Sequence, residues 1–273
     1  MLLICILLLI NHKPIKMKKI IFSLIIYAIS FSVNAQVWQL EAVKLKKGSE
    51  KEYLETEKFW GKVKKLAVKE DKLRAWYVFK NITKVEEGKE RRYDYFVFNF
   101  YKDKAEMNSN IDMLDLAMRA HKGKLSKSKI RYNFQNWDSA REYTNTYTLE
   151  RLDRTINTVP VSKKTPVYIY PMAEKNEEYE NLEMKFAKKS HEIDILDYRK
   201  AFWAFDKIID RSENANKEIT HFTFEKYTSD NLPKSRRTDW DKMEYEESLM
   251  WDMALKSRKG FPRVQLEFVM STE

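Results

Sequence analysis

The sequence contains one cysteine, Cys5, and it lies in an N-terminal segment that we expect to be removed from the mature protein. A mature chain without cysteine offers no disulfide, no thiol nucleophile and no cysteine ligand for a metal. Its stability must therefore come from a packed core. An aromatic content of 14% supplies much of the apolar surface for that core.

Glycine is also scarce. Five glycines in 273 residues provide no glycine-rich loop for phosphate, and no serine stands in the sequence context of a nucleophile elbow. The histidines beyond the N-terminal segment, His121, His191 and His221, fall in three different predicted elements and form no pair four residues apart. We therefore predict no metal site and no bound cofactor.

The charge is mildly basic, at +10 with 34% charged residues. No basic stretch alternates with exposed aromatic residues, as a nucleic-acid groove would require. We therefore exclude nucleic acid as a partner.

The first 35 residues have the pattern of a secretory signal. Lysines at 18 and 19 precede an apolar run over residues 20–31, and small residues lead to Ala35. We expect cleavage before Gln36 and a periplasmic or secreted protein without a membrane anchor. An uncleaved anchor is the alternative. The earlier apolar run over residues 2–10 is too short to span a bilayer, and Met17 is the alternative start of the chain.

Beyond the signal, the sequence repeats itself at an offset of 126 residues. The matched positions include Val43 and Ile169, Tyr53 and Tyr179, Glu57 and Glu183, Trp60 and Phe186, Phe96 and Phe222, and Phe98 and Phe224. The offset far exceeds the period of a solenoid, so it indicates two copies of one domain-sized module. We predict modules at 36–156 and 167–273, joined by a proline-containing linker at 157–166.

Each module is predicted to run strand, helix, strand, strand, helix, strand. In the first module the strands fall at 37–45, 73–82, 93–101 and 146–152, and the helices end near residues 68 and 121. This order is that of a ferredoxin-like (βαββαβ) unit, a four-stranded antiparallel sheet with both helices on one face. Strand 93–101 is apolar on both sides, so its second face needs a partner as well. We therefore expect an α+β fold in which two tandem ferredoxin-like modules pack sheet to sheet as an intramolecular dimeric α/β barrel.

Several segments resemble the dimeric α/β barrel superfamily, and within it uncharacterised secreted bacterial proteins with one or two such modules. They are Val43-Lys44-Leu45-Lys46-Lys47-Gly48, Glu52-Tyr53-Leu54, Trp60, Trp76-Tyr77, Tyr93-Asp94-Tyr95 and Ala120-His121-Lys122-Gly123. The resemblance spans the mature chain and implies a barrel made by two ferredoxin-like sheets. Such relatives include cofactor-free monooxygenases, lactone isomerases and haem-dependent chlorite dismutase-like enzymes. No catalytic motif of theirs matches this chain residue by residue.

The candidate ligand site follows from the two faces of the third strands. The side with Phe96, Phe98, Phe222 and Phe224 is uniformly apolar, so we assign it to a core beneath the helices. The opposite side mixes aromatic and polar groups, as ligand cavities do, and we expect it between the sheets. The predicted ligand-binding residues are Tyr95, Asn99, His221 and Glu225, with Glu150 and Glu267 of the last strands close by.

A second signal is the recurrence of Glu57 and Glu183 on apolar helix faces. A carboxylate held among aromatic side chains has a raised pKa and can act as an acid or base near neutral pH. Pairing with a lysine or capping of a loop amide explains the recurrence equally well, and both interpretations stay open.

Three functions follow from these observations. The first is an exported protein whose barrel binds a small apolar or aromatic molecule, or serves as a scaffold. The alternative is a cofactor-free monooxygenase or isomerase in which His221 and either Glu150 or Glu267 transfer protons. The third is a haem-dependent enzyme.

Overall fold

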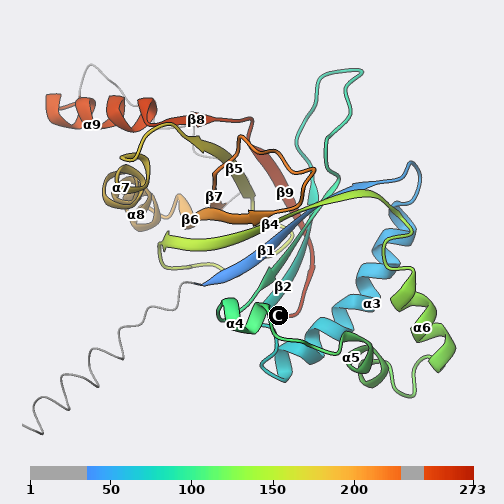
Figure 1. Cartoon of the computed structure of the whole chain (residues 1–273). Coiled ribbons are helices and arrows are strands. Elements are labelled where there is room, and N and C mark those ends of the chain that lie inside the picture. Colours follow the sequence, from blue (N-terminus) through green and yellow to red (C-terminus); the bar gives the residue numbers. More distant parts are fainter. Residues whose placement is uncertain (1–35, 229–242) are drawn as a thin grey trace, which may run out of the picture. The chain divides into compact units, whose positions relative to one another are not determined.

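A computed structural model describes residues 36–228 and 243–273 (Figure 1). The predicted signal sequence and the alternative start at Met17 lie outside the described residues. The predicted cleavage site, between Ala35 and Gln36, lies at their edge. Gln36–Glu273 forms one compact unit. None of the described helices is both long enough and apolar enough to cross a membrane.

The first half of the described chain contains four long strands and four helices. They are β1 (Val37–Leu45), α3 (Glu50–Lys69), β2 (Ala75–Asn81), β3 (Tyr95–Phe100), α4 (Lys104–Met107), α5 (Met113–Ala120), α6 (Lys127–Gln135) and β4 (Arg141–Arg154). Gly48, at a φ of 80°, turns the chain from β1 into α3, a backbone conformation that side chains with a Cβ disfavour. The strand at 37–45 and the helix to about residue 68 are confirmed, whereas α6 lies in a segment for which no helix is predicted.

The second half continues with shorter helices. Its elements are β5 (Val167–Glu174), α7 (Tyr179–Leu182), a π-helical turn (Glu183–Ala187), α8 (Lys188–Leu196), β6 (Lys200–Arg211), β7 (His221–Tyr227), α9 (Tyr245–Lys256), β8 (Arg258–Gly260) and β9 (Val264–Ser271). In Figure 1, α3, α5 and α6 lie together, away from α7, α8 and α9. The two groups of helices therefore cover different parts of the sheet.

Eight strands form one closed antiparallel barrel. Their order is β7, β6, β4, β1, β3, β2, β9 and β5, and β5 pairs in turn with β7 to close the ring. The short β8 pairs with residues 172–174 of β5, beyond residues 167–169, which pair with β9. Two pairings join the halves of the chain: β4 with β6, and β2 with β9.

The predicted fold class, two tandem ferredoxin-like modules packed sheet to sheet as an α/β barrel, is wrong. Two separate sheets would leave β4, β2, β6 and β9 as edges with unpaired backbone N–H and C=O groups. The structure instead pairs these edges with one another, which satisfies the backbone groups and leaves a single barrel.

The barrel interior holds the largest apolar cluster. The ring of Phe224, on β7, lies with its centroid 5.0 Å from Trp38 and 5.7 Å from Phe98, although β7 borders neither β1 nor β3. These contacts cross the barrel, so the faces of β3 and β7 that carry Phe96, Phe98, Phe222 and Phe224 point inward. The assignment of these four rings to a core beneath the helices is therefore wrong.

The opposite faces of the same strands form a second core with the helices. Tyr95 and Val97 pack there with Tyr53, Val63 and Leu116, in the cluster of α3 and α5. A smaller cluster of Tyr179, Trp203 and Phe205 lies outside the barrel in the second half. Alternation of side chains along each strand separates the inner from the outer set.

Closure of the barrel makes a testable prediction about the first half alone. A fragment of residues 36–156 keeps β1 to β4 but exposes the edges of β4 and β2 that β6 and β9 cover. We expect it to form dimers or larger species, which size-exclusion chromatography with light scattering detects. A monomeric fragment with a sharp thermal transition contradicts the prediction.

Candidate functional site

The six predicted ligand-binding residues do not share a cavity. Tyr95 lies outside the barrel, where its hydroxyl donates to Glu50 Oε1 at 2.6 Å. Asn99 is also outside the barrel, beneath α3. On the outer face of the barrel, Glu150 of β4 stands opposite Lys207 of β6, and Glu267 of β9 stands opposite Lys80 of β2. The expected interior lining was wrong because the assignment of faces was inverted.

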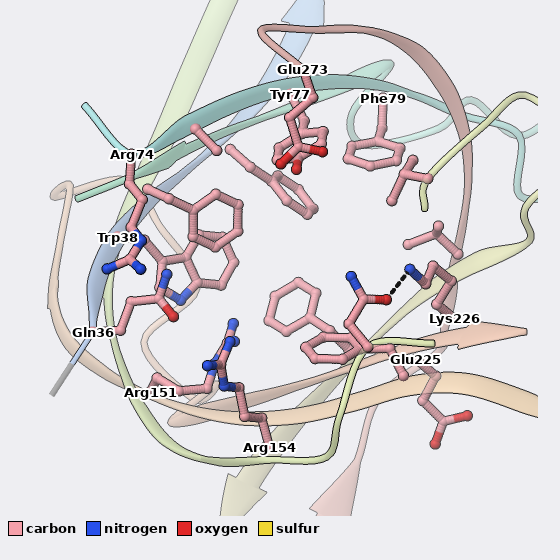
Figure 2. Close-up of a pocket in the computed structure, with 18 residues that line it drawn as sticks. Gln36, Trp38, Arg74, Tyr77, Phe79, Arg151, Arg154, Glu225, Lys226 and Glu273 are labelled. Carbon is pink, nitrogen blue, oxygen red and sulfur yellow. Dashed lines mark hydrogen bonds between the residues drawn. The ribbon is translucent and has the colours of Figure 1, made fainter. Parts of the chain in front are cut away.

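His221 and Glu225 lie near the helices of the second half. His221 is fully buried, with Nε2 3.3 Å from Glu180 Oε1 and Nδ1 2.8 Å from the Thr220 hydroxyl. Burial lowers the pKa of His221 to about 4, so it is neutral at pH 7. Glu225 Oε1 lies 3.0 Å from Lys200 Nζ, and its carboxylate points away from the barrel interior (Figure 2).

A further group of potential ligands surrounds His221. Carboxylate and imidazole atoms of Glu174, Glu180 and His221 lie within 4.8 Å of one another. However, Lys207 Nζ is 2.6 Å from Glu180 Oε1 and supplies a cation there already. The group is therefore a network of ion pairs around a neutral histidine, and we assign no metal to it.

A cluster of charged side chains lines a cavity of about 500 Å³ between the outer face of the barrel and the first group of helices. We call it the helix-side cavity. Its walls include four large aromatic side chains, Trp60, Trp76, Phe134 and Trp137. Its polar groups are Glu41, Glu57, Lys64, Asn99, Gln135 and Arg141. Of the six predicted residues, only Asn99 lines it.

Arg141 connects the two carboxylates of the helix-side cavity. Its Nη2 donates to Glu57 Oε1 at 2.8 Å, and its Nη1 donates to Glu41 Oε2 at 2.9 Å. The side chains of Glu57 and Arg141 are 2% and 6% exposed, so this ion pair is almost dry. Burial raises the pKa of Glu57, and Arg141 opposes the shift. The direction agrees with the raised pKa expected for Glu57, but its partner is an arginine and not the lysine or loop amide of the alternative interpretation.

Lys64 completes the cluster from α3. Its Nζ donates to Asn99 Oδ1 at 2.9 Å, and Asn99 Nδ2 donates to Glu41 Oε1 at 3.0 Å. Burial lowers the pKa of Lys64, while Glu41 and Glu57 oppose the shift. At a given pH, the neutral amine therefore makes up a larger fraction of Lys64 than of an exposed lysine.

Two buried donors of residues that line this cavity, Trp60 Nε1 and Arg141 Nε, have no acceptor among the described residues. Trp60 lines the cavity, and its Nε1 is buried but donates to no atom of the described residues. A buried donor without a partner destabilises the fold by roughly 1–3 kcal/mol. A ligand with an oxygen acceptor would remove that cost.

The second cavity, of about 370 Å³, lies at one end of the barrel (Figure 2). We call it the barrel cavity. Seven of its 18 lining residues are aromatic, and its cations are Arg74, Arg151, Arg154 and Lys226. It is reached at the start of β1 and the end of β4, near Gln36 and Arg154, and the linker passes it at Asn157 and Val161.

The chain matches no protein-family model and no curated protein. Solved structures match it over most of its length. A "putative monooxygenase" from Lactobacillus acidophilus is 12% identical, with 88% of this chain and 95% of that chain covered and a TM-score of 0.52. A protein of the same name from Fusobacterium nucleatum is 12% identical, with coverages of 88% and 94% and a TM-score of 0.50.

An anthrone oxidase-like protein is 7% identical, with coverages of 88% and 93% and a TM-score of 0.52. At such identities, these likenesses show a shared fold alone. The resemblance to the dimeric α/β barrel superfamily therefore stays a prediction from the sequence.

Sequence reasoning missed Arg141 and all four of the barrel-cavity cations. Lys64 had a visible signal, because it stands seven residues after Glu57 on the same helix and shares its inward face. Arg141 had none, since 84 residues separate it from Glu57.

The Glu57–Arg141 pair makes a prediction about stability. Glu57→Gln removes the buried negative charge and leaves the Arg141 guanidinium poorly compensated. We expect a loss of roughly 3 kcal/mol in the free energy of unfolding. Urea denaturation measures it, with Glu55→Gln on the exposed face of α3 as the matched control. A loss equal to that of the control contradicts the prediction.

Proposed function

We propose that the protein binds a small, planar, weakly acidic molecule in the helix-side cavity and removes a proton from it, as a cofactor-free oxygenase or isomerase would. The observation that carries this proposal is the position of Lys64. Its amine has a lowered pKa and lies in an aromatic cavity beside a guanidinium. Perturbed ionisable groups that line a cavity are typical of acid–base sites.

Each group of the cavity has a part in this proposal. The rings of Trp60, Trp76 and Trp137 suit a flat substrate. Neutral Lys64 accepts the proton, while Asn99 holds its amine in place. The substrate is left with a negative charge on oxygen, which the new ammonium, Arg141 and the free N–H of Trp60 can stabilise.

The names of the fold neighbours agree with the proposal, which rests on the position of Lys64 in the helix-side cavity. Two are called monooxygenases and one is called anthrone oxidase-like. Anthrone is a planar ketone that loses a proton to form a stabilised anion, so its chemistry matches the groups of the helix-side cavity. The predicted pair of His221 with Glu150 or Glu267 is replaced in this proposal, because those residues do not line the cavity.

Haem is not proposed as a cofactor. The residues that line the helix-side cavity and the barrel cavity include none of the described histidines. His121, the nearest in the first half, uses Nε2 on the backbone oxygen of Phe59. Neither cavity therefore offers the imidazole ligand that haem proteins of this kind commonly use.

We also propose export to the periplasm or beyond, from the lysine-rich and apolar pattern of residues 1–35. The alternative to the enzyme hypothesis is a small-molecule-binding or scaffold protein that binds its ligand without turnover.

The test uses anthrone as the probe, with oxygen uptake and absorption spectroscopy as readouts. We expect the wild-type protein to accelerate oxidation, with a rate that rises with pH through a pKa below the ordinary lysine value. Lys64→Met should lower kcat by about 100-fold or more, the usual contribution of a general base. Lys65→Met, on the exposed side of α3, is the control and should retain full activity.

Two results contradict the enzyme hypothesis. Equal rates for Lys64→Met and Lys65→Met would exclude Lys64 as the base. Binding of anthrone, seen as quenching of tryptophan fluorescence, without any acceleration of its oxidation would favour a binding protein instead.

A further inference from the structure

The barrel cavity is unevenly charged. Arg74, Arg151, Arg154 and Lys226 line it, against two acidic residues: Glu273, which faces it beside Tyr77, and Glu225, whose carboxylate points away from it (Figure 2). The helix-side cavity, in contrast, has two acidic and two basic side chains. The two cavities therefore suit ligands of different charge.

Arg151 is held in place by a buried carboxylate. Asp206 is 0% exposed, and its Oδ1 accepts from Arg151 Nε at 2.7 Å and from Trp38 Nε1 at 2.8 Å. The guanidinium carbon lies 5.9 Å from the Trp38 ring centroid and 5.8 Å from that of Phe202. These contacts fix the orientation of Arg151 through Nε and leave both Nη atoms without an acceptor among the described residues.

Unlike Arg151, which is paired with Asp206, two other guanidinium groups of the cavity have no carboxylate partner. The side chains of Arg74 and Arg154 form no hydrogen bond or ion pair with the described part of the chain, and both are exposed at the mouth of the cavity. Figure 2 shows the side chains of Arg151 and Arg154 directed into the cavity from β4, while Arg74, just before β2, lies along its rim near Gln36. Like charges that face one space repel, and a bound anion relieves that repulsion.

The other side of the cavity offers apolar surface and a weaker cation. Phe100, Phe202 and Phe224 contribute rings to the wall. Lys226 donates to the side-chain oxygen of Asn157 and to the backbone oxygen of Val159, so its amine is already engaged. Burial lowers the pKa of Lys226 to about 8. The arginines are therefore the principal groups for an anion.

We infer that the barrel cavity is a binding site for an organic anion with a flat apolar body, whose carboxylate or sulfonate lies against Arg151 and Arg154 while its rings lie against the aromatic wall. A guanidinium donates two parallel hydrogen bonds to such a group. A volume of about 370 Å³ is within the range of small-molecule sites. This site is separate from the helix-side cavity and does not depend on the function proposed there.

The experiment compares two probes that share one aromatic scaffold. 8-Anilinonaphthalene-1-sulfonate carries the anion, and N-phenyl-1-naphthylamine lacks it. Fluorescence titration of the full protein should give one site per chain, with the sulfonate bound at least about tenfold more tightly. Arg154→Gln should weaken sulfonate binding about tenfold or more, as expected for a charged hydrogen-bond partner, and should change binding of the neutral probe less than about twofold.

Two further variants sharpen the test. Arg131→Gln removes one exposed positive charge from α6, outside the residues that line the barrel cavity, and should have no effect. Asp206→Asn should weaken sulfonate binding through loss of the Arg151 orientation, with circular dichroism as the check on folding.

The inference is overturned if the two probes bind equally, if neither binds, or if Arg131→Gln weakens the sulfonate as much as Arg154→Gln. Lys64→Met should leave sulfonate binding unchanged, and Arg154→Gln should leave anthrone oxidation unchanged. The two cavities can therefore fail their tests independently.

Discussion

The pairing of strand edges is the constraint on which this structure depends. β4 pairs with β6 from Tyr147 to Arg154, and β2 pairs with β9 from Tyr77 to Asn81. Each pairing joins strands from different halves of the chain, and together they remove the four edges that separate sheets would leave open. Unpaired edges carry backbone groups that otherwise recruit another chain. Closure therefore decides both the stability of the unit and which side of every strand faces inward.

The distribution of polar groups follows from closure. Rings such as Trp38 and Phe224 fill the interior, while the outer faces need the helices to cover Trp76 and Val97. Asp206 is a charged side chain buried inside the barrel, where Arg151 and Trp38 are its partners. The helix-side cavity has equal numbers of acidic and basic side chains, whereas at the barrel cavity the basic side chains outnumber the acidic ones and suit an anionic ligand.

The sequence predicted elements better than it predicted contacts. The strand at β1 and the helix at α3 follow from periodicity, which depends on local chemistry. Periodicity also separates Phe96 and Phe98 from Tyr95 and Val97, but both sets are apolar, so it cannot say which one faces inward. The closed barrel was missed for a related reason, since edge pairing depends on register between strands distant in the chain. The same limit hid the contact of Trp38 with Asp206, 168 residues apart.

Disulfide crosslinking across the two joins tests barrel closure most directly, because residues 36–273 contain no cysteine of their own. Cysteines at Lys80 and Glu267 bridge β2 and β9, and cysteines at Glu150 and Lys207 bridge β4 and β6. Facing Cα atoms in antiparallel strands are about 4.5–5.5 Å apart, within reach of a disulfide. The account predicts that both pairs crosslink within a monomer and that cysteines at Lys80 and Glu150 do not. Absence of crosslinks at both joins would contradict it.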